Sequence, residues 1–167
     1  MIIVCGLNEA PDLVIKYNVG ATIGILGPET KHPEFPTLDE HQRLRLSFND
    51  INAPSEGMVA ASEDDAMRLI RFINTWDQKQ PLLIHCWAGI SRSTATAFAA
   101  LCILRPDADE LELAQELRNA SPSATPNRLI TARIDNVLAR DGRMLRAIES
   151  IGRGADAYSG RPFILKT

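Results

Sequence analysis

Residues 81–105 constrain the fold more than any other part of the chain. The run "PLLIHC" at 81–86 is continuously apolar, as expected of a strand that is buried on both faces. A turn around Gly89 separates it from residues 91–105, an almost wholly apolar segment that predicts a buried helix. A buried strand that leads directly into a buried helix indicates an α/β domain with a mostly parallel sheet.

The other segments extend this pattern. We predict one domain over residues 1–167, with a central, mostly parallel sheet of four to five strands flanked by helices and a helical C-terminal half. Residues from about 153 to 167 form a tail whose pattern indicates no element. Strands are predicted at 2–7, 21–26, 43–48 and 81–86, a surface loop at 27–41, and helices at 11–18, 62–76, 91–105, from Asp107, at 127–139 and at 143–151.

Composition narrows the class of protein. A net charge of −3 argues against a broad nucleic-acid or membrane surface. No apolar stretch reaches the length of a membrane span, and "MIIVCGLNEAPD" lacks the features of a signal peptide. The three cysteines, Cys5, Cys86 and Cys102, form no disulfide framework and indicate a reducing compartment. We therefore expect a cytoplasmic protein.

The stretch "HCWAGISRST" at 85–94 has the features of an anion site. Cys86 ends the interior strand, which is where ligands bind in α/β sheets. The backbone N–H groups of the turn, together with a helix N-terminus, can hold an anion and stabilise a thiolate. Arg92 adds a planar group that grips two oxygens of a phosphate. These residues suit nucleophilic attack on phosphorus.

The spacing from His85-Cys86 through five residues to Arg92-Ser93 resembles the signature of the protein tyrosine phosphatase superfamily. The short chain and "GISRST" look most like its dual-specificity branch. The resemblance implies phosphomonoester hydrolysis through a cysteinyl-phosphate at Cys86, with no cofactor and no metal. It implies that Ser93 hydrogen-bonds the sulfur and that His85 orders the loop. The phosphate would be held by Trp87, Ala88, Gly89, Ile90, Ser91 and Arg92.

The resemblance also implies an acid on a separate loop. Asp50 lies 36 residues before Cys86, after the predicted strand 43–48, and is our candidate. Glu56 is a rival, whereas Asp64 and Asp65 are better explained as acids in the first turn of a helix. In "SATPNRL", Asn127 either braces the phosphate loop or simply starts a helix.

Several residues have a plain structural alternative. Cys102 is predicted to lie in the core. Cys5 either packs in the core as a buried side chain or approaches the site as a thiol. Trp87 either lines the pocket mouth or packs on the loop. We expect Arg128 to be solvated rather than to contact substrate. We also expect His32 and His41 to be solvated, because both lie in the polar loop region.

The predicted substrate is a phosphorylated protein or a small phosphomonoester, and no nucleic-acid partner is expected. Lipid-directed relatives often carry lysines in the loop, whereas "WAGIS" has none, so an inositol-phosphate or lipid phosphatase ranks lower. A pseudo-phosphatase that binds phosphate without turnover is a second alternative. A sulfurtransferase is a third, although its usual loop is one residue shorter.

Overall fold

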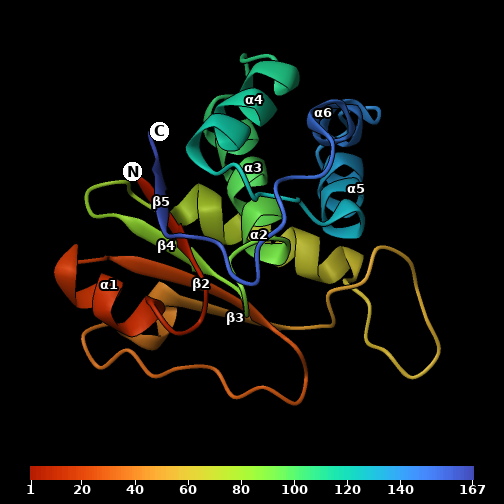
Figure 1. Ribbon diagram of the computed structural model, residues 1–167. Coiled ribbons are helices and arrows are strands. Elements are labelled where there is room, and N and C mark those ends of the chain that lie inside the picture. The colour runs from red at the N-terminus through yellow and green to blue at the C-terminus, as the bar shows by residue number, and fades with distance from the viewer.

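The computed structural model describes residues 1–167, and its centre is a five-stranded sheet (Figure 1). The strand order is β3-β2-β4-β1-β5. Strands β3, β2, β4 and β1 run parallel to one another, and β5 is antiparallel to β1 at the edge. The prediction of a mostly parallel sheet of four to five strands is confirmed. The strands are β1 (Ile2–Cys5), β2 (Ala21–Leu26), β3 (Arg43–Ser47), β4 (Leu82–His85) and β5 (Phe163–Leu165).

Strand β4 lies in the middle of this sheet, which explains its composition. It pairs with β2 on one side and β1 on the other, and all four of its residues are buried. Because both of its faces are covered, its first three residues, Leu82 to Ile84, are apolar, and His85 is the buried polar exception at its end. The register places His85 beside Gly24 of β2 and Cys5 of β1. Strands β1 and β4 therefore end together, directly before Cys86, and β2 continues for two further residues to Leu26.

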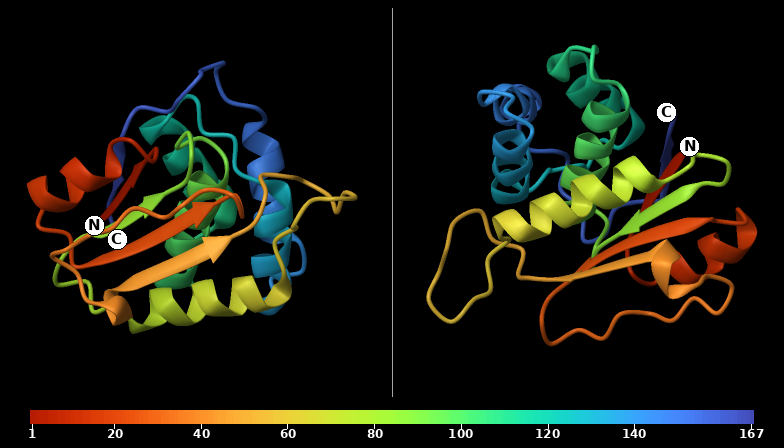
Figure 2. Two further views of the ribbon diagram at one scale, coloured as in Figure 1. Left: turned by 90° about the horizontal axis from the view of Figure 1, so that it is seen from below. Right: turned by 180° about the vertical axis from the view of Figure 1, so that it is seen from behind.

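The helices cover the two faces of the sheet unequally (Figures 1 and 2). Helix α1 packs with the 27–39 loop against a small core on one face, and five helices form the main core on the other. No helix is both long and apolar enough to cross a membrane. The helices are α1 (Ala10–Lys16), η1 (Glu40–Gln42, a 3₁₀ turn), α2 (Glu63–Thr75), α3 (Arg92–Leu104), α4 (Glu110–Ala120), α5 (Arg128–Val137) and α6 (Arg143–Ile151).

The start of α4 differs from the prediction. The expected start at Asp107 is wrong, because residues 105–108 form a turn that is closed by the Ala108 N–H on the Arg105 carbonyl. Asp109 is the N-cap instead, and its carboxylate accepts the N–H groups of the second and third helical residues.

The C-terminal segment, for which the pattern indicates no element, contributes β5 to the sheet. Strand β5 has only three residues, too few for a periodic pattern to be recognised. Its pairing with β1 brings the two ends of the chain side by side (Figure 1), and the N-terminal amine donates to Thr167 Oγ1 at 3.0 Å. The segment between α6 and β5 (residues 152–162), called the strap below, thereby crosses toward the carboxyl ends of β1 and β4.

Candidate active site

The Cys loop (residues 86–92) joins the end of β4 to the start of α3. Cys86 is buried, its Sγ accepts the N–H of Gly89 at 3.3 Å, and it lies 3.1 Å from Ser93 Oγ. Gly89 has a φ of 72°, in the left-handed region that favours glycine. This conformation turns the chain back toward the sulfur. The loop glycine and Ser93, both singled out in the sequence, therefore contact Cys86.

The backbone of the Cys loop is held from outside through its carbonyl groups. Four carbonyl oxygens accept N–H groups of neighbouring segments, whereas the N–H groups of the same four residues donate to no protein atom. Carbonyls bound outward leave N–H groups free to converge on the inside of the loop, where they can bind an anion. The acceptor and donor pairs are Trp87 with Leu7 (3.1 Å), Ala88 with Gly160 (2.8 Å), Ile90 with Thr125 (2.9 Å) and Ser91 with Asn127 (3.3 Å).

Gly89 is packed directly between two other backbone segments. A Cβ on Gly89 would lie 2.7 Å from the Gly6 nitrogen and 2.8 Å from the carbonyl carbon of Cys5. A Cβ on Gly160 of the strap would lie 2.7 Å from the carbonyl oxygen of Gly89. Side-chain atoms cannot approach backbone so closely, so these contacts require glycine. The sequence pattern does not single out Gly160, because a glycine in an irregular tail carries no periodic signal.

Arg92 extends from the start of α3 toward the segment that follows β3. Its side chain is buried, and one terminal nitrogen donates to the Phe48 carbonyl at 2.9 Å. Its Nε is buried without a hydrogen-bond partner and lies 3.7 Å from Asp50 Oδ2. A guanidinium group with an unpaired donor in a buried position is suited to bind an oxyanion.

Asp50 lies against the Cys loop. Its Oδ1 accepts the Ser91 hydroxyl at 2.7 Å and the Asn127 amide at 2.8 Å. Asn127 is at the same time the N-cap of α5, where its Oδ1 accepts the N–H of Ile130 at 3.0 Å. The two alternatives for Asn127 therefore coexist: it starts a helix, and it ties Asp50 to the site.

The rival acids lie elsewhere. Asp64 and Asp65 are in the first turn of α2, where Asp65 forms a capping box with Ser62. Glu56 is exposed in the loop that precedes α2 and makes no hydrogen bond or ion pair to the Cys loop. Asp50 is thus the one candidate acid that contacts Cys-loop residues.

His85 is buried behind the Cys loop and faces a second imidazole. A Cβ on Gly24 would lie 2.6 Å from His85 Nε2 and 3.0 Å from His32 Nδ1, so both rings pack over this glycine. Burial, and then the nearby His32, lower the pKa of His85 to about 4, which keeps the ring neutral at pH 7. The expectation that His32 is solvated is wrong, since its Nδ1 is buried. Gly24 lies inside β2, and a glycine within a strand is the sequence signal that another group packs closely against the backbone there.

The remaining cysteines are buried free thiols. Burial raises the pKa of Cys5 far above its usual range, and the Glu9 carboxylate adds to this effect. Burial likewise raises the pKa of Cys102, to about 12. Neither thiol is activated as a nucleophile at neutral pH. Cys102 lies in the main core, as predicted.

Two further residues differ in environment. The Trp87 side chain is exposed at the rim of the Cys loop, consistent with a position at a pocket mouth. Arg128 is at the surface and forms an ion pair with Glu149 of α6. No group of three or more His, Cys, Asp or Glu side chains is placed to hold a metal ion.

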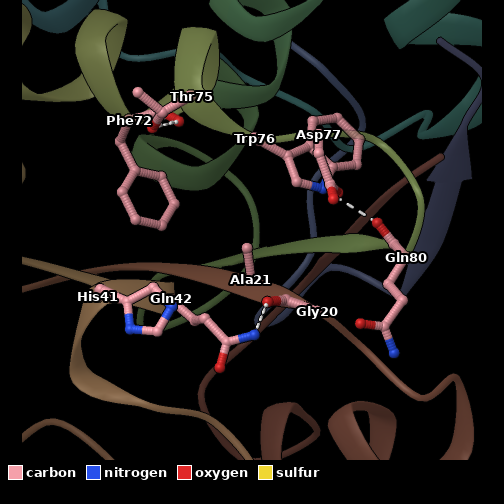
Figure 3. A pocket seen from close by; sticks show the side chains of 9 residues that line it. All are labelled: Gly20, Ala21, His41, Gln42, Phe72, Thr75, Trp76, Asp77 and Gln80. Carbon is pink, nitrogen blue, oxygen red and sulfur yellow. Dashed lines mark hydrogen bonds between the residues drawn. The ribbon is translucent and has the colours of Figure 1, made fainter.

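A separate cavity of about 230 Å³ lies where β2 and β4 begin, at the opposite end of the sheet from Cys86 (Figure 3). Two of its polar side chains are bonded to backbone: the Gln42 amide donates to the Gly20 carbonyl at 2.9 Å, and the Trp76 indole donates to the Gln80 carbonyl at 3.0 Å. It lies away from the chemistry-bearing residues and provides no nucleophile.

Comparisons with known proteins identify the family. The model of the protein-tyrosine phosphatase family matches residues 41–127, which is half of the chain and includes the Cys loop, Asp50 and Asn127. The chain belongs to the protein-tyrosine phosphatase family. No curated protein sequence matches it.

Solved phosphatases share the fold of this family member at low sequence identity. The PTP-2 phosphatase of Cydia pomonella superposes with a TM-score of 0.63 and 18% identity, covering 81% of this chain and 84% of that chain. Human DUSP28 gives 0.62 and 18%, covering 81% and 86%. PTPMT1 in complex with PI(5)P gives 0.61 and 16%, covering 84% and 94%. The predicted resemblance to the dual-specificity branch is confirmed at the level of the fold.

Acid should destabilise this phosphatase-family domain through His85. Folding lowers the pKa of His85 from 6.5 to about 4, so the unfolded chain binds a proton that the folded chain does not across this window. Between pH 7 and pH 4.5 the wild type should lose about 2–3 kcal/mol more unfolding free energy than His85→Gln. Urea unfolding of both proteins at the two pH values measures the difference. Equal losses would show that His85 is not held neutral by the fold.

Proposed function

We propose that this protein is a cysteine-dependent phosphatase that hydrolyses phosphorylated tyrosine, serine or threonine side chains of proteins. The observation that carries the proposal is the arrangement around Cys86. Four N–H groups of the Cys loop and the Nε of Arg92 have no hydrogen-bond partner in the protein, and they lie in the same short segment as the buried sulfur of Cys86. Several N–H donors and a guanidinium group match the oxygens of a phosphoryl group.

In the first step the Cys86 thiolate attacks phosphorus from the side opposite the ester oxygen. The S–P bond forms as the P–O bond breaks, and Asp50 donates its proton to the leaving oxygen. The N–H groups of residues 87–92 and the Arg92 guanidinium stabilise the charge on the three remaining oxygens. The products of this step are an alcohol or phenol and a cysteinyl-phosphate.

In the second step water hydrolyses the cysteinyl-phosphate. The Asp50 carboxylate takes a proton from the attacking water, and the S–P bond breaks to release inorganic phosphate. The Ser93 hydroxyl, 3.1 Å from the sulfur, stabilises the departing thiolate with a hydrogen bond. Neutral His85 supports the loop by packing. No metal or cofactor enters either step.

An inositol phosphate or lipid is the second candidate substrate, since the PTPMT1 neighbour is in complex with PI(5)P. The loop side chains "WAGIS" offer no lysine or arginine for a second phosphate, which favours protein substrates. A panel of phosphopeptides and inositol phosphates distinguishes them. Phosphate binding without turnover would indicate a pseudo-phosphatase, and turnover of thiosulfate with cyanide a sulfurtransferase. The three free thiols fit the proposed cytoplasmic location.

Removal of the nucleophile should abolish turnover. Cys86→Ser is expected to lower the kcat for p-nitrophenyl phosphate by ~10⁴-fold or more, because serine is not ionised at neutral pH. Affinity for inorganic phosphate, measured by calorimetry, should persist because the N–H groups remain. Cys5→Ser is the matched control at the end of the neighbouring strand and should keep its activity. Substantial turnover by Cys86→Ser would refute the nucleophile assignment.

Loss of the acid should matter most for poor leaving groups. Asp50→Ala is expected to reduce kcat for a phosphoserine peptide by ~10²–10³-fold and to affect p-nitrophenyl phosphate less, since nitrophenolate leaves without a proton. The comparison of the two substrates isolates proton donation. Glu56→Ala is the control, and the same selective loss in that variant would assign the acid to Glu56.

The strap should be needed for the geometry of the Cys loop. In Gly160→Ala the new Cβ collides with the Gly89 carbonyl, which displaces the loop N–H groups from the phosphoryl oxygens. A ~10-fold or greater loss of kcat/KM for p-nitrophenyl phosphate is expected. Gly27→Ala, whose Cβ meets only ordinary contacts at 3.8 Å and 3.9 Å, controls for the loss of a glycine. Full activity of folded Gly160→Ala would show that the strap does not position the loop.

A further inference from the structure

A second cleft lies directly beside the Cys loop. It has a volume of about 110 Å³, and three segments form it: the β1–α1 turn, the first residues after Cys86, and the strap. The Gly160 N–H on the Ala88 carbonyl, at 2.8 Å, fixes the strap against the Cys loop. Because the cleft shares Trp87 and Ala88 with the proposed phosphate site, a residue next to the phosphorylated one can reach it. It is lined by Leu7, Asn8, Glu9, Trp87, Ala88, Tyr158 and Ser159.

Two aromatic side chains stand exposed at this cleft. Trp87 is 59% exposed and Tyr158 is 97% exposed, so more than half of the surface of each residue is open to solvent. The two residues come from different segments of the chain: Trp87 directly follows Cys86, and Tyr158 is in the strap. Exposed aromatic rings that gather at one hollow mark an interaction site rather than a core.

The cleft also contains a carboxylate without a partner. Glu9 is half-buried, makes no ion pair, and does not cap α1 with its side chain. Its Oε2 lies over Gly6, 2.9 Å from the position of a Cβ there. No lysine or arginine lines the cleft, and Arg161 of the neighbouring segment lines a different cavity. The electrostatic character of the cleft is therefore negative.

We propose that this cleft binds the cationic side chain of a lysine or arginine that flanks the phosphorylated residue of a protein substrate. Aromatic faces beside a carboxylate attract a cation through the ring quadrupole and through charge, and the aliphatic stem of the cation packs on the rings. A second phosphate, as in an inositol polyphosphate, would be repelled by Glu9. The proposal rests on the proposed function and adds a preference for basic phosphopeptides.

Binding to the Cys86→Ser protein tests this independently of turnover. A set of fluorescent phosphotyrosine peptides carries arginine, alanine or glutamate at single positions on either side of the phosphotyrosine, and anisotropy gives each Kd. Arginine at one position should tighten binding ~3- to 10-fold over alanine, and glutamate there should weaken it. In the Glu9→Gln background the arginine gain should disappear. In the Glu9→Lys background the order should invert, with the glutamate peptide bound most tightly.

Asp12→Lys is the matched control, because Asp12 is an exposed acid of α1 that does not line the cleft and the charge change is the same. It should keep the arginine preference. Equal affinity for the three peptides, failure of Glu9→Lys to invert the order, or tighter binding of an inositol polyphosphate than of the arginine peptide would overturn the proposal. Turnover of p-nitrophenyl phosphate by the wild type reports separately on the proposed function.

Discussion

The close approach of three backbone segments at Gly89 is the constraint on which the candidate site depends. The turn after β1 lies on one side of the Cys loop and the strap on the other, with no side chain between them. This packing leaves the carbonyls of the loop facing outward to N–H donors of its neighbours. The Gly89 N–H donates to the sulfur of Cys86, and the loop N–H groups that have no protein acceptor are the basis of the proposed anion site.

The site is assembled from parts of the chain that are far apart in the sequence. Arg92 reaches the Phe48 carbonyl, and Asn127 reaches Asp50, so the loop after β3, the Cys loop and the start of α5 are bonded to one another. Both contacts use polar groups that take no part in the backbone hydrogen bonds of a helix or strand: the side chains of Arg92, Asn127 and Asp50, and the Phe48 carbonyl. A change in the position of α5 or the strap would therefore reach the nucleophile through a few hydrogen bonds.

Charge is distributed unevenly around this centre. His85 stays neutral because burial and His32 both oppose its protonation, so the positive character near Cys86 comes from Arg92 and from backbone N–H groups. Carboxylates stand on two sides of the loop, Asp50 toward α5 and Glu9 toward the strap. In the proposed function Asp50 exchanges a proton with the substrate, and in the proposed cleft Glu9 selects the substrate by charge.

The sequence by itself determined the α/β class, four of the five strands, and the family signature from His85 to Ser93. These features depend on local patterns: continuous apolar runs, helical spacing, and a nine-residue motif with a fixed turn. The tertiary structure alone decided that Gly160 braces the loop, that His32 packs against His85, that Asn127 holds Asp50, and that Glu9 shares a cleft with Tyr158. Each of these is a contact between distant segments, and only the packing of the whole chain brings such residues together.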